Sequence, residues 1–201
     1  MCGDIFLNFY NKELILASKS PRRQDILNMI GLDFQVHPSD YSEDCDEQKT
    51  PKELAIYHSL QKCEDVANKF SNSWIIGADT IVVLGYEILE KPSDHKEAKK
   101  MLRKLSGQTH EVITGYTIYN SSNDKYLSNS ESTKVTFHEL SDDIIEYYLN
   151  HYKYKDKAGA YAIQDFSALF VEKLNGCFYN VVGFPVAAFC HQLRNNLSSC
   201  L

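Results

Sequence analysis

Three cations, Lys19, Arg22 and Arg23, crowd the segment ASKSPRR at residues 17–23. An apolar run precedes this segment, and Ser20 followed by proline is typical of the start of a helix. The macrodipole already makes that end positive, so each added cation there costs about 0.3–1 kcal/mol. We interpret this locally unfavourable cluster as a site for an anion.

The same segment offers the groups that bind phosphate. A strand-to-helix junction presents free backbone N–H groups at the positive end of the helix dipole. Ser18 and Ser20 add hydroxyl donors, and Arg22 can hold a phosphate through two N–H groups. The alternative is that Arg22 and Arg23 are solvated surface residues, and the segment alone does not decide between the two. It matches neither the glycine-rich phosphate loop nor the glycine-rich dinucleotide pattern.

A single carboxylate, Asp79, interrupts the apolar run IIGADTIVV at residues 75–83. The β-branched composition predicts a buried strand, and a buried carboxylate is costly unless it is paired or bound to a metal. Gly77 shares a face of this strand with Asp79, so we expect room for a ligand beside the carboxylate. A structural salt bridge is the alternative. We favour catalysis or Mg²⁺ binding.

Three further polar residues lie in segments that can complete such a site. Lys91 in LEKP precedes a proline, so we expect its backbone to be extended. Its side chain either pairs with phosphate or with Asp79, or Lys91 is simply a surface lysine. Gln164 ends DKAGAYAIQ and offers both donor and acceptor atoms for the edge of a base, or it caps the next strand. Glu43 lies in an acidic stretch, as a metal ligand or as a solvated residue.

Strand and helix patterns alternate along the chain and must position these residues. We expect strands at residues 14–17, 34–37, 74–84, 88–89, 112–119 and 133–137, and a hairpin of 169–174 with 178–182 around the Asn175-Gly176 turn. We expect helices from 21 to Gly31, from 51 to 70, from a cap at Ser93 or Asp94 to Gly107, from 142 to 150 and from 185 to 195. The order predicts an α/β fold with a mixed sheet, because the hairpin interrupts the alternation.

Length and charge restrict the class of protein. The 201 residues suit one domain, or one domain with two lobes. The formal net charge of −6 argues against a nucleic-acid-binding protein, so the cations of ASKSPRR suit a small anion. The six cysteines have no zinc-site spacing. We find no signal peptide and no apolar run of roughly 18–20 residues, and expect an intracellular protein with no membrane partner.

Seven segments in this order resemble the Maf family of nucleoside triphosphate pyrophosphatases, and most of all its eukaryotic branch. They are LASKSPRRQDIL, HPSDYSED, IIGADTIVV, ILEKP, MLRKLSGQTHEVITG, DKAGAYAIQ and NVVGFP, and the resemblance covers residues 14–193. It implies a single Maf-like domain over residues 1–201, with a two-lobed α/β fold, an elongated mixed sheet flanked by helices, and a nucleotide cleft between the lobes. It also implies a cytoplasmic homodimer. This enzyme would cut a nucleoside triphosphate between the α and β phosphates, with a divalent cation, Mg²⁺ or Mn²⁺.

The resemblance also implies residue roles, which are carried over by position. Asp79 matches the general base, and the phosphate-binding loop is matched by Ser18, Arg22 and Arg23. The polar active-site set is matched by Glu43, Lys62 and Lys91. The subgroup acting on dTTP and UTP is marked by a trio that is matched by Arg22, Thr80 and Gln164. The sister subgroup acting on 7-methyl-GTP differs there, so we expect a pyrimidine triphosphate, including modified ones.

These roles suggest a mechanism. Mg²⁺ held by Asp79 and Glu43 bridges the triphosphate, and Asp79 orients or deprotonates the attacking water. Lys62, Lys91 and Arg22 offset the charge that builds on the phosphate oxygens.

Three departures from the family pattern keep rival functions open. Lys153-Tyr154 stands where the family usually has Glu-Pro, Ser167-Ala168 where it has Gly-Gly, and His58 where an arginine is common. A nucleotide-binding regulator that no longer hydrolyses is one rival, and a 7-methyl-GTP pyrophosphatase is another. A phosphatase acting on monophosphates is a third, which the cluster of cations disfavours because it suits a longer anion.

Overall fold

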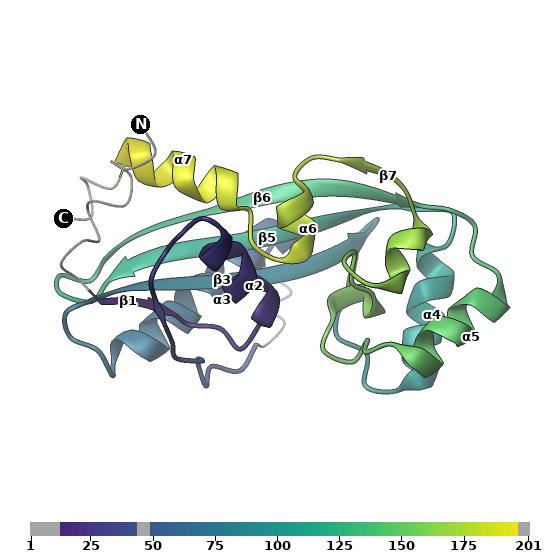
Figure 1. Cartoon of the computed structure of the whole chain (residues 1–201), viewed down its shortest axis with the longest axis horizontal. Helices are drawn as coiled ribbons and strands as arrows, with labels where there is room; N and C mark the ends of the chain where they lie inside the picture. Colours follow the sequence, from purple (N-terminus) through teal and green to yellow (C-terminus); the bar gives the residue numbers. More distant parts are fainter. Residues whose placement is uncertain (1–12, 44–48, 197–201) are drawn as a thin grey trace. The chain divides into compact units, whose positions relative to one another are not determined.

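The computed structural model describes residues 13–43 and 49–196, and Figure 1 shows the order of its elements. Within these residues one sheet contains seven strands: β1 Glu13–Leu16, β2 Gln35–Val36, β3 Ser73–Leu84, β4 Glu87–Leu89, β5 Thr109–Asn120, β6 Lys125–Phe137 and β7 Val171–Asn175. The helices are α2 Pro21–Met29, α3 Pro51–Ala67, α4 His95–Leu105, α5 Asp142–His151, α6 Phe178–Val182 and α7 Val186–Asn196, and two short 3-10 helices are η1 Ala158–Ala160 and η2 Phe166–Phe170.

The sheet is mixed, as predicted. Its strand order is β2-β1-β3-β5-β6-β7, and β4 pairs with β3 outside this path. β1 runs parallel to both β2 and β3, while the β3–β4 and β6–β7 pairs are antiparallel. Parallel neighbours need a long crossover connection. Helices α2 and α3 lie in the connections between these parallel strands, and they are the helices that carry cations toward the candidate site.

The chain divides into two compact units, in agreement with the predicted two lobes. Unit 1 comprises residues 1–79, 114–131 and 183–201, and unit 2 comprises residues 80–113 and 132–182. Strands β3, β5 and β6 each contribute residues to both units.

In unit 1, helix α3 packs closely on the sheet. Its N-terminus is fixed by a capping box, in which the Thr50 side chain accepts a hydrogen bond from the Glu53 N–H and Glu53 bonds back to Thr50. A Cβ at Gly115 of β5 would lie 2.2 Å from the backbone of Ala55 in α3, so only glycine permits this approach. The buried residues of this core are Ile15, Ala17, Cys63, Val66, Ile75 and Tyr119.

In unit 2, helices α4 and α5 cover a core that includes Leu102, Phe137, Tyr148 and Phe170. Each helix begins as predicted, with an N-cap whose oxygen accepts a backbone N–H. Asp94 caps α4 at the Glu97 N–H, and Ser141 caps α5 at the Ile144 N–H. No helix in the described part of the chain is long and apolar enough to cross a membrane.

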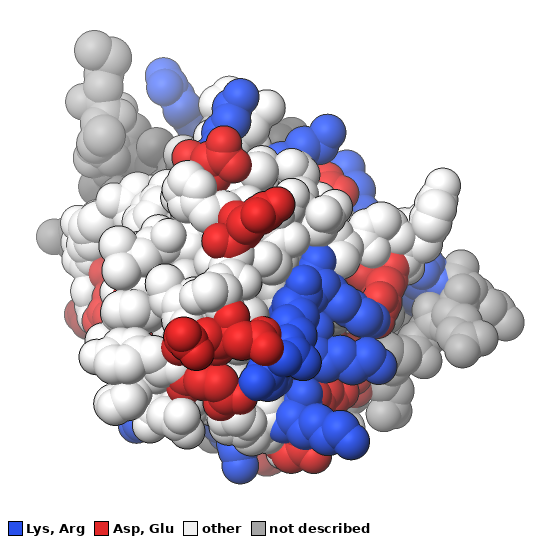
Figure 2. All heavy atoms as spheres, turned by 90° about the vertical axis from the view of Figure 1, so that its right-hand side faces the viewer, with Lys and Arg blue, Asp and Glu red and all other residues white. Residues whose placement is uncertain are grey.

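Charged side chains of both signs lie on the surface of unit 2. Figure 2 looks on to this side and shows Lys and Arg spheres gathered beside Asp and Glu spheres. Helix α4 supplies cations that pair with neighbouring carboxylates: Arg103 Nη2 lies 2.6 Å from Asp142 Oδ2, and Lys104 Nζ lies 2.5 Å from Glu87 Oε1. These pairs link α4 to α5 and to β4, so both cations have carboxylate partners within unit 2.

The predicted hairpin is wrong in its second half. β7 forms at Val171–Asn175, but residues 178–182 form helix α6 instead of a strand. Asn180 of α6 is fully buried, and its Nδ2 donates to Val112 O at 2.8 Å and to Thr133 Oγ1 at 3.0 Å. A short apolar run fits a strand or a buried helix equally well. The hydrogen-bond partners of Asn180 are distant in sequence, and Asn180 reaches them from a helix and not from a strand.

Candidate active site

Asp79 and Lys62 form a buried ion pair in unit 1. Asp79 is 6% exposed in the middle of β3, and Lys62 is 8% exposed on α3. Lys62 Nζ lies 2.7 Å from Asp79 Oδ1 and donates to Ala78 O at 3.4 Å. The predicted buried position of Asp79 is confirmed, and its burial is compensated by a cation and not left unpaired.

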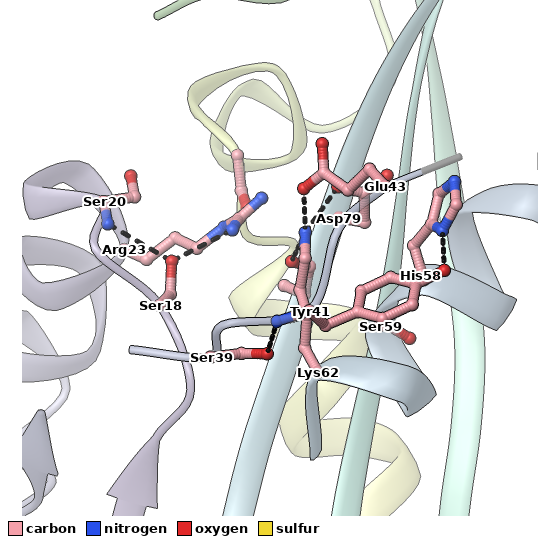
Figure 3. A network of polar contacts seen from close by, with 12 residues as sticks. Ser18, Ser20, Arg23, Ser39, Tyr41, Glu43, His58, Ser59, Lys62 and Asp79 are labelled. Atoms are coloured by element: carbon pink, nitrogen blue, oxygen red, sulfur yellow. Dashed lines mark hydrogen bonds and ion pairs between the residues drawn. The ribbon is translucent and has the colours of Figure 1, made fainter. Parts of the chain in front are cut away.

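Glu43 reaches the same ammonium group. Its Oε1 lies 2.5 Å from Lys62 Nζ, and its side chain is more exposed than that of Asp79. Figure 3 shows both carboxylates directed at Lys62. Two carboxylates from distant segments therefore converge on one cation.

The segment that carries Glu43 is attached to α3. Asp65 Oδ2 accepts hydrogen bonds from Ser39 Oγ and from the Asp40 N–H, both at 2.8 Å. Burial alone would raise the pKa of Asp65, but these two hydrogen bonds and nearby Lys69 hold it below the usual value. The ionised Asp65 therefore anchors the start of this segment.

A second attachment joins Tyr41 to His58. The Tyr41 hydroxyl lies 3.0 Å from His58 Nδ1, and His58 is 4% exposed (Figure 3). His58, Lys62 and Asp65 lie along one face of α3, because they are separated by four and three residues. The segment therefore follows this face of the helix and ends with Glu43 at Lys62.

Arg23 and Ser18 form the phosphate-binding candidate at the start of α2. Arg23 Nη1 donates to Ser18 Oγ at 3.1 Å and Arg23 Nε donates to Gly183 O at 2.9 Å, so Arg23 is not a solvated surface residue. The Ser20 N–H donates to the same Ser18 oxygen at 3.2 Å. The predicted helix start at Pro21 is confirmed.

The charge of Arg23 is coupled to the carboxylates. Desolvation lowers the pKa of Arg23 below its usual value. The negative charges of Asp79 and Glu43 act to raise this pKa, and the positive charge of Arg22 acts to lower it. Figure 3 shows the guanidinium group extending toward the side on which Glu43 and Asp79 lie. The structure thus brings together five of the predicted residues in unit 1, namely Ser18, Arg23, Glu43, Lys62 and Asp79, and Arg22 acts on Arg23 electrostatically.

The other three predicted residues belong to unit 2. Thr80 is half-buried in β3, Lys91 is exposed after β4, and Gln164 is exposed between η1 and η2. The motifs of Lys91 and Gln164 meet, because the Gly159 N–H donates to Glu90 O at 3.2 Å. Gly159 has a φ of 69°, a conformation that glycine adopts without strain.

Comparison with known proteins places this arrangement in a family. The profile described as Maf-like protein matches residues 13–196. The chain belongs to the Maf family. It is 52% identical over 175 residues to a dTTP/UTP pyrophosphatase of Pyrococcus furiosus. The aligned residues cover 87% of this chain and 90% of that protein. It is 46% identical to a dTTP/UTP pyrophosphatase of Thermotoga maritima, with 86% of this chain and 84% of that protein covered.

A solved structure supports the fold. The Ham1 protein of Staphylococcus aureus superposes with a TM-score of 0.52 at 14% identity, over 92% of this chain and 100% of that chain. At this identity the likeness concerns the fold alone, and it agrees with the mixed α/β sheet.

The carboxylates of this Maf-family site fit a divalent cation in part. Glu43 and Asp79 approach one point, occupied by the Lys62 ammonium, and carboxylate oxygens are the ligands that Mg²⁺ prefers. Among the described residues, no group of three or more His, Cys, Asp and Glu side chains is placed to hold a metal by itself. Two carboxylates suit a cation that takes its remaining ligands from phosphate and water, as Mg²⁺ does.

Gly77 does not leave room for a ligand, contrary to the sequence prediction. A Cβ at this position would lie 2.3 Å from Ser59 O and 2.6 Å from Cys63 Sγ, both in α3. The space beside Gly77 is therefore filled by the helix. This close approach is what brings Lys62 within reach of Asp79 on the same face of β3.

Sequence reasoning missed Tyr41 and Asp65, and it noted His58 only as a departure from the family pattern. His58 and Asp65 lie outside the seven segments that carry the resemblance, and Tyr41 lies in HPSDYSED, but the resemblance implies no role for it. The available signal was the spacing of polar residues on α3, which places His58, Lys62 and Asp65 on one helix face. The partners of that face, in residues 39–43, follow no periodic pattern and required the tertiary structure.

Proposed function

We propose that this chain is a nucleoside triphosphate pyrophosphatase that hydrolyses the α–β phosphate bond of dTTP and UTP. The products are the nucleoside monophosphate and pyrophosphate. The observation that carries the proposal is the cluster in unit 1, where Lys62 joins two carboxylates beside Arg23 and Ser18. The high identity to proteins named dTTP/UTP pyrophosphatase supports this choice of substrate.

The start of α2 binds the phosphate chain in this proposal. Ser18 and Arg23 supply a hydroxyl and a guanidinium, and Arg22 adds a second guanidinium in the same turn. Guanidinium groups bind phosphate oxygens through paired N–H donors. This anion explains why cations crowd a helix terminus that is already positive.

Asp79 acts as the base that orients or deprotonates the attacking water. Lys62 fixes the carboxylate through a 2.7 Å contact, so the acceptor oxygen is held before substrate binds. Lys62 and Lys91 offset the charge that develops on the phosphate oxygens, the kind of electrostatic stabilisation on which phosphoryl chemistry depends.

Glu43 and Asp79 would hold the divalent cation, Mg²⁺ or Mn²⁺. When bound, such a cation neutralises phosphate charge and orients the reacting groups. The convergence of the two carboxylates supports this assignment. The test measures activity with and without added metal. We expect a chelator to abolish the activity and Glu43→Gln to reduce it.

The pyrimidine preference rests on Arg22, Thr80 and Gln164. Gln164 is exposed and carries an amide that both donates and accepts hydrogen bonds, as the edge of uracil or thymine requires. We also propose a single Maf-like domain that works as a cytoplasmic homodimer. Membership of the eukaryotic branch stays a prediction, because the relatives named above are archaeal and bacterial.

The test is pyrophosphate release from UTP, dTTP, CTP, GTP, 7-methyl-GTP and ATP, each with Mg²⁺ and with Mn²⁺. Release mainly from UTP and dTTP is the expected result. Release mainly from 7-methyl-GTP would retain the reaction but overturn the pyrimidine assignment. A folded protein that binds UTP in calorimetry and releases no pyrophosphate would favour the silent regulator.

A further inference from the structure

The turn that carries Gln164 is held in place by buried residues on both sides of it. Gln164 is exposed, whereas Ile163 before it is 8% exposed and Ser167 beyond it is fully buried. The turn spans residues 162–167 of unit 2, from the residues that follow η1 into the start of η2. A single exposed amide is thus presented by a short segment whose neighbours are held inside the protein.

Ser167 closes the turn. Its hydroxyl lies 2.6 Å from Ala162 O and accepts the Ala162 N–H at 3.1 Å, so one side chain satisfies both backbone groups of the first residue. The Asp165 N–H adds a bond to Ala162 O at 3.1 Å. These contacts fix the distance between the two ends of the turn.

Asp165 ties the turn to the core. Its Oδ1 accepts the Ser167 N–H at 2.9 Å and lies 2.8 Å from Ser167 Oγ. Its Oδ2 accepts a weaker hydrogen bond, at 3.4 Å, from the hydroxyl of Tyr148 in α5. Tyr148 is fully buried against Phe170, so its hydroxyl is held in position by the close packing of the core.

A second anchor precedes the turn. The Tyr161 hydroxyl lies 2.7 Å from His110 Nε2, and both side chains are buried. The rings of Tyr161, His110 and Phe137 meet edge to face, with centroids 4.9 to 5.4 Å apart. The backbone on each side of Gln164 is therefore held by a buried side chain.

We propose that Ser167 and Asp165 are positioning residues for base selection, because they hold the turn from which Gln164 meets the nucleobase. This inference rests on the proposed function, in which Gln164 contacts the base. A group that is held in its binding geometry loses little entropy on binding, and an oriented amide rejects a base whose donors and acceptors are exchanged. The two residues therefore affect discrimination between bases more than the cleavage step.

The experiment compares kcat and KM for UTP and CTP in Ser167→Ala, Asp165→Ala, Asp165→Asn and Gln164→Ala. We expect Ser167→Ala and Asp165→Ala to raise KM for UTP roughly tenfold, as loss of a hydrogen-bonded support would. The preference for UTP over CTP should fall, with kcat within about twofold of the parent. Asp165→Asn keeps an oxygen for the Ser167 N–H and should retain most of the preference.

Asp94→Ala is the matched control for a purely structural effect. Asp165 caps η2 and Asp94 caps α4, but the Asp94 side chain accepts from the Glu97 N–H and not from a residue of the turn. We expect the melting temperature of Asp94→Ala to fall as in Asp165→Ala while the UTP preference stays unchanged. Tyr148→Phe removes only one hydroxyl, and its smaller loss of preference is measurable even if Asp165→Ala does not fold.

The outcomes separate this inference from the proposed function. An unchanged UTP preference in folded Ser167→Ala and Tyr148→Phe, with a lowered preference in Gln164→Ala, would overturn the positioning role. An unchanged preference in Gln164→Ala would overturn both the positioning role and the assignment of Gln164. If the parent releases no pyrophosphate, calorimetric binding of UTP and CTP to the same variants still measures the preference.

Discussion

Lys62 on α3 lies 2.7 Å from Asp79 on β3, and both side chains are almost completely buried. Such a pair is costly to desolvate, and breaking it by removing one partner leaves an uncompensated charge. The same ammonium also contacts Glu43, so one cation organises both carboxylates of the candidate site. This relationship makes Lys62 as important to the geometry of the candidate site as the carboxylates that it contacts.

Asp79→Asn should reduce turnover by about 10²–10⁴-fold, the range associated with loss of a general base. The amide keeps the shape of the side chain and an oxygen that can accept from Lys62, so the fold should be retained. Pyrophosphate release and circular dichroism measure the two effects. Asp124→Asn is the control, because it changes a carboxylate at a turn with a φ of 57°, which asparagine tolerates. Turnover near the parent value in Asp79→Asn would contradict the assignment.

Lys62→Met should lower the free energy of unfolding by about 3–5 kcal/mol, because it leaves Asp79 buried without its cation. The double variant Lys62→Met/Asp79→Asn should be less destabilised than the sum of the single changes, by about 0.5–3 kcal/mol. Urea denaturation measures all three variants. Lys69→Met removes the exposed pair with Asp40 and should cost at most about 1 kcal/mol. Strict additivity of the two buried changes would show that the pair is not coupled.

Gly77→Ala should destabilise the protein by at least about 1–3 kcal/mol, the usual cost of overpacking. Its Cβ would meet the Ser59 carbonyl at 2.3 Å, and that backbone cannot yield without displacing α3. Activity should fall as well, because displacement of α3 moves Lys62. Gly31→Ala is a useful comparison, with a φ of 76° but no atom within 4 Å of the added Cβ, and should lose stability without losing activity. A normal melting temperature in Gly77→Ala would contradict the packing described here.

His110 should make stability depend on pH. Burial lowers the pKa of His110 from 6.5 to about 4, so the unfolded chain binds a proton in a range where the folded protein does not. Stability from this group is therefore complete above pH 6.5 and is lost as the pH falls toward about 4. Between about pH 7.5 and about pH 5 the loss should be about 2 kcal/mol. Urea denaturation at both pH values tests this.

His110→Gln is the control for this titration. Glutamine can still meet the Tyr161 hydroxyl but does not titrate, so the difference between the two pH values should shrink by the contribution of His110. The remaining pH dependence then belongs to other groups. An unchanged pH dependence in His110→Gln would show that the buried histidine does not titrate as described.

Local patterns in the sequence predicted most of the elements. Ser141 and Asp94 signal helix starts, and the apolar run around Asp79 signals a buried strand, because caps and periodicity depend only on neighbouring residues. The helix starts and the buried strand survive in the structure because tertiary contacts reinforce the same local choice. The cations at the start of α2 likewise predict an anion site from local electrostatics, and this site stays a prediction.

The tertiary structure decided what depends on residues far apart in sequence. Residues 178–182 form a helix whose Asn180 bonds to residues 68 and 47 positions away, and no local pattern contains those partners. The space beside Gly77 belongs to α3 and not to a ligand for the same reason. By itself the sequence determined which residues carry charge and, apart from residues 178–182, most of the helical and extended segments. Only the packing of α3 on the sheet decided that Lys62 is the residue joining Asp79 to Glu43, because burial and pairing are properties of the assembled core.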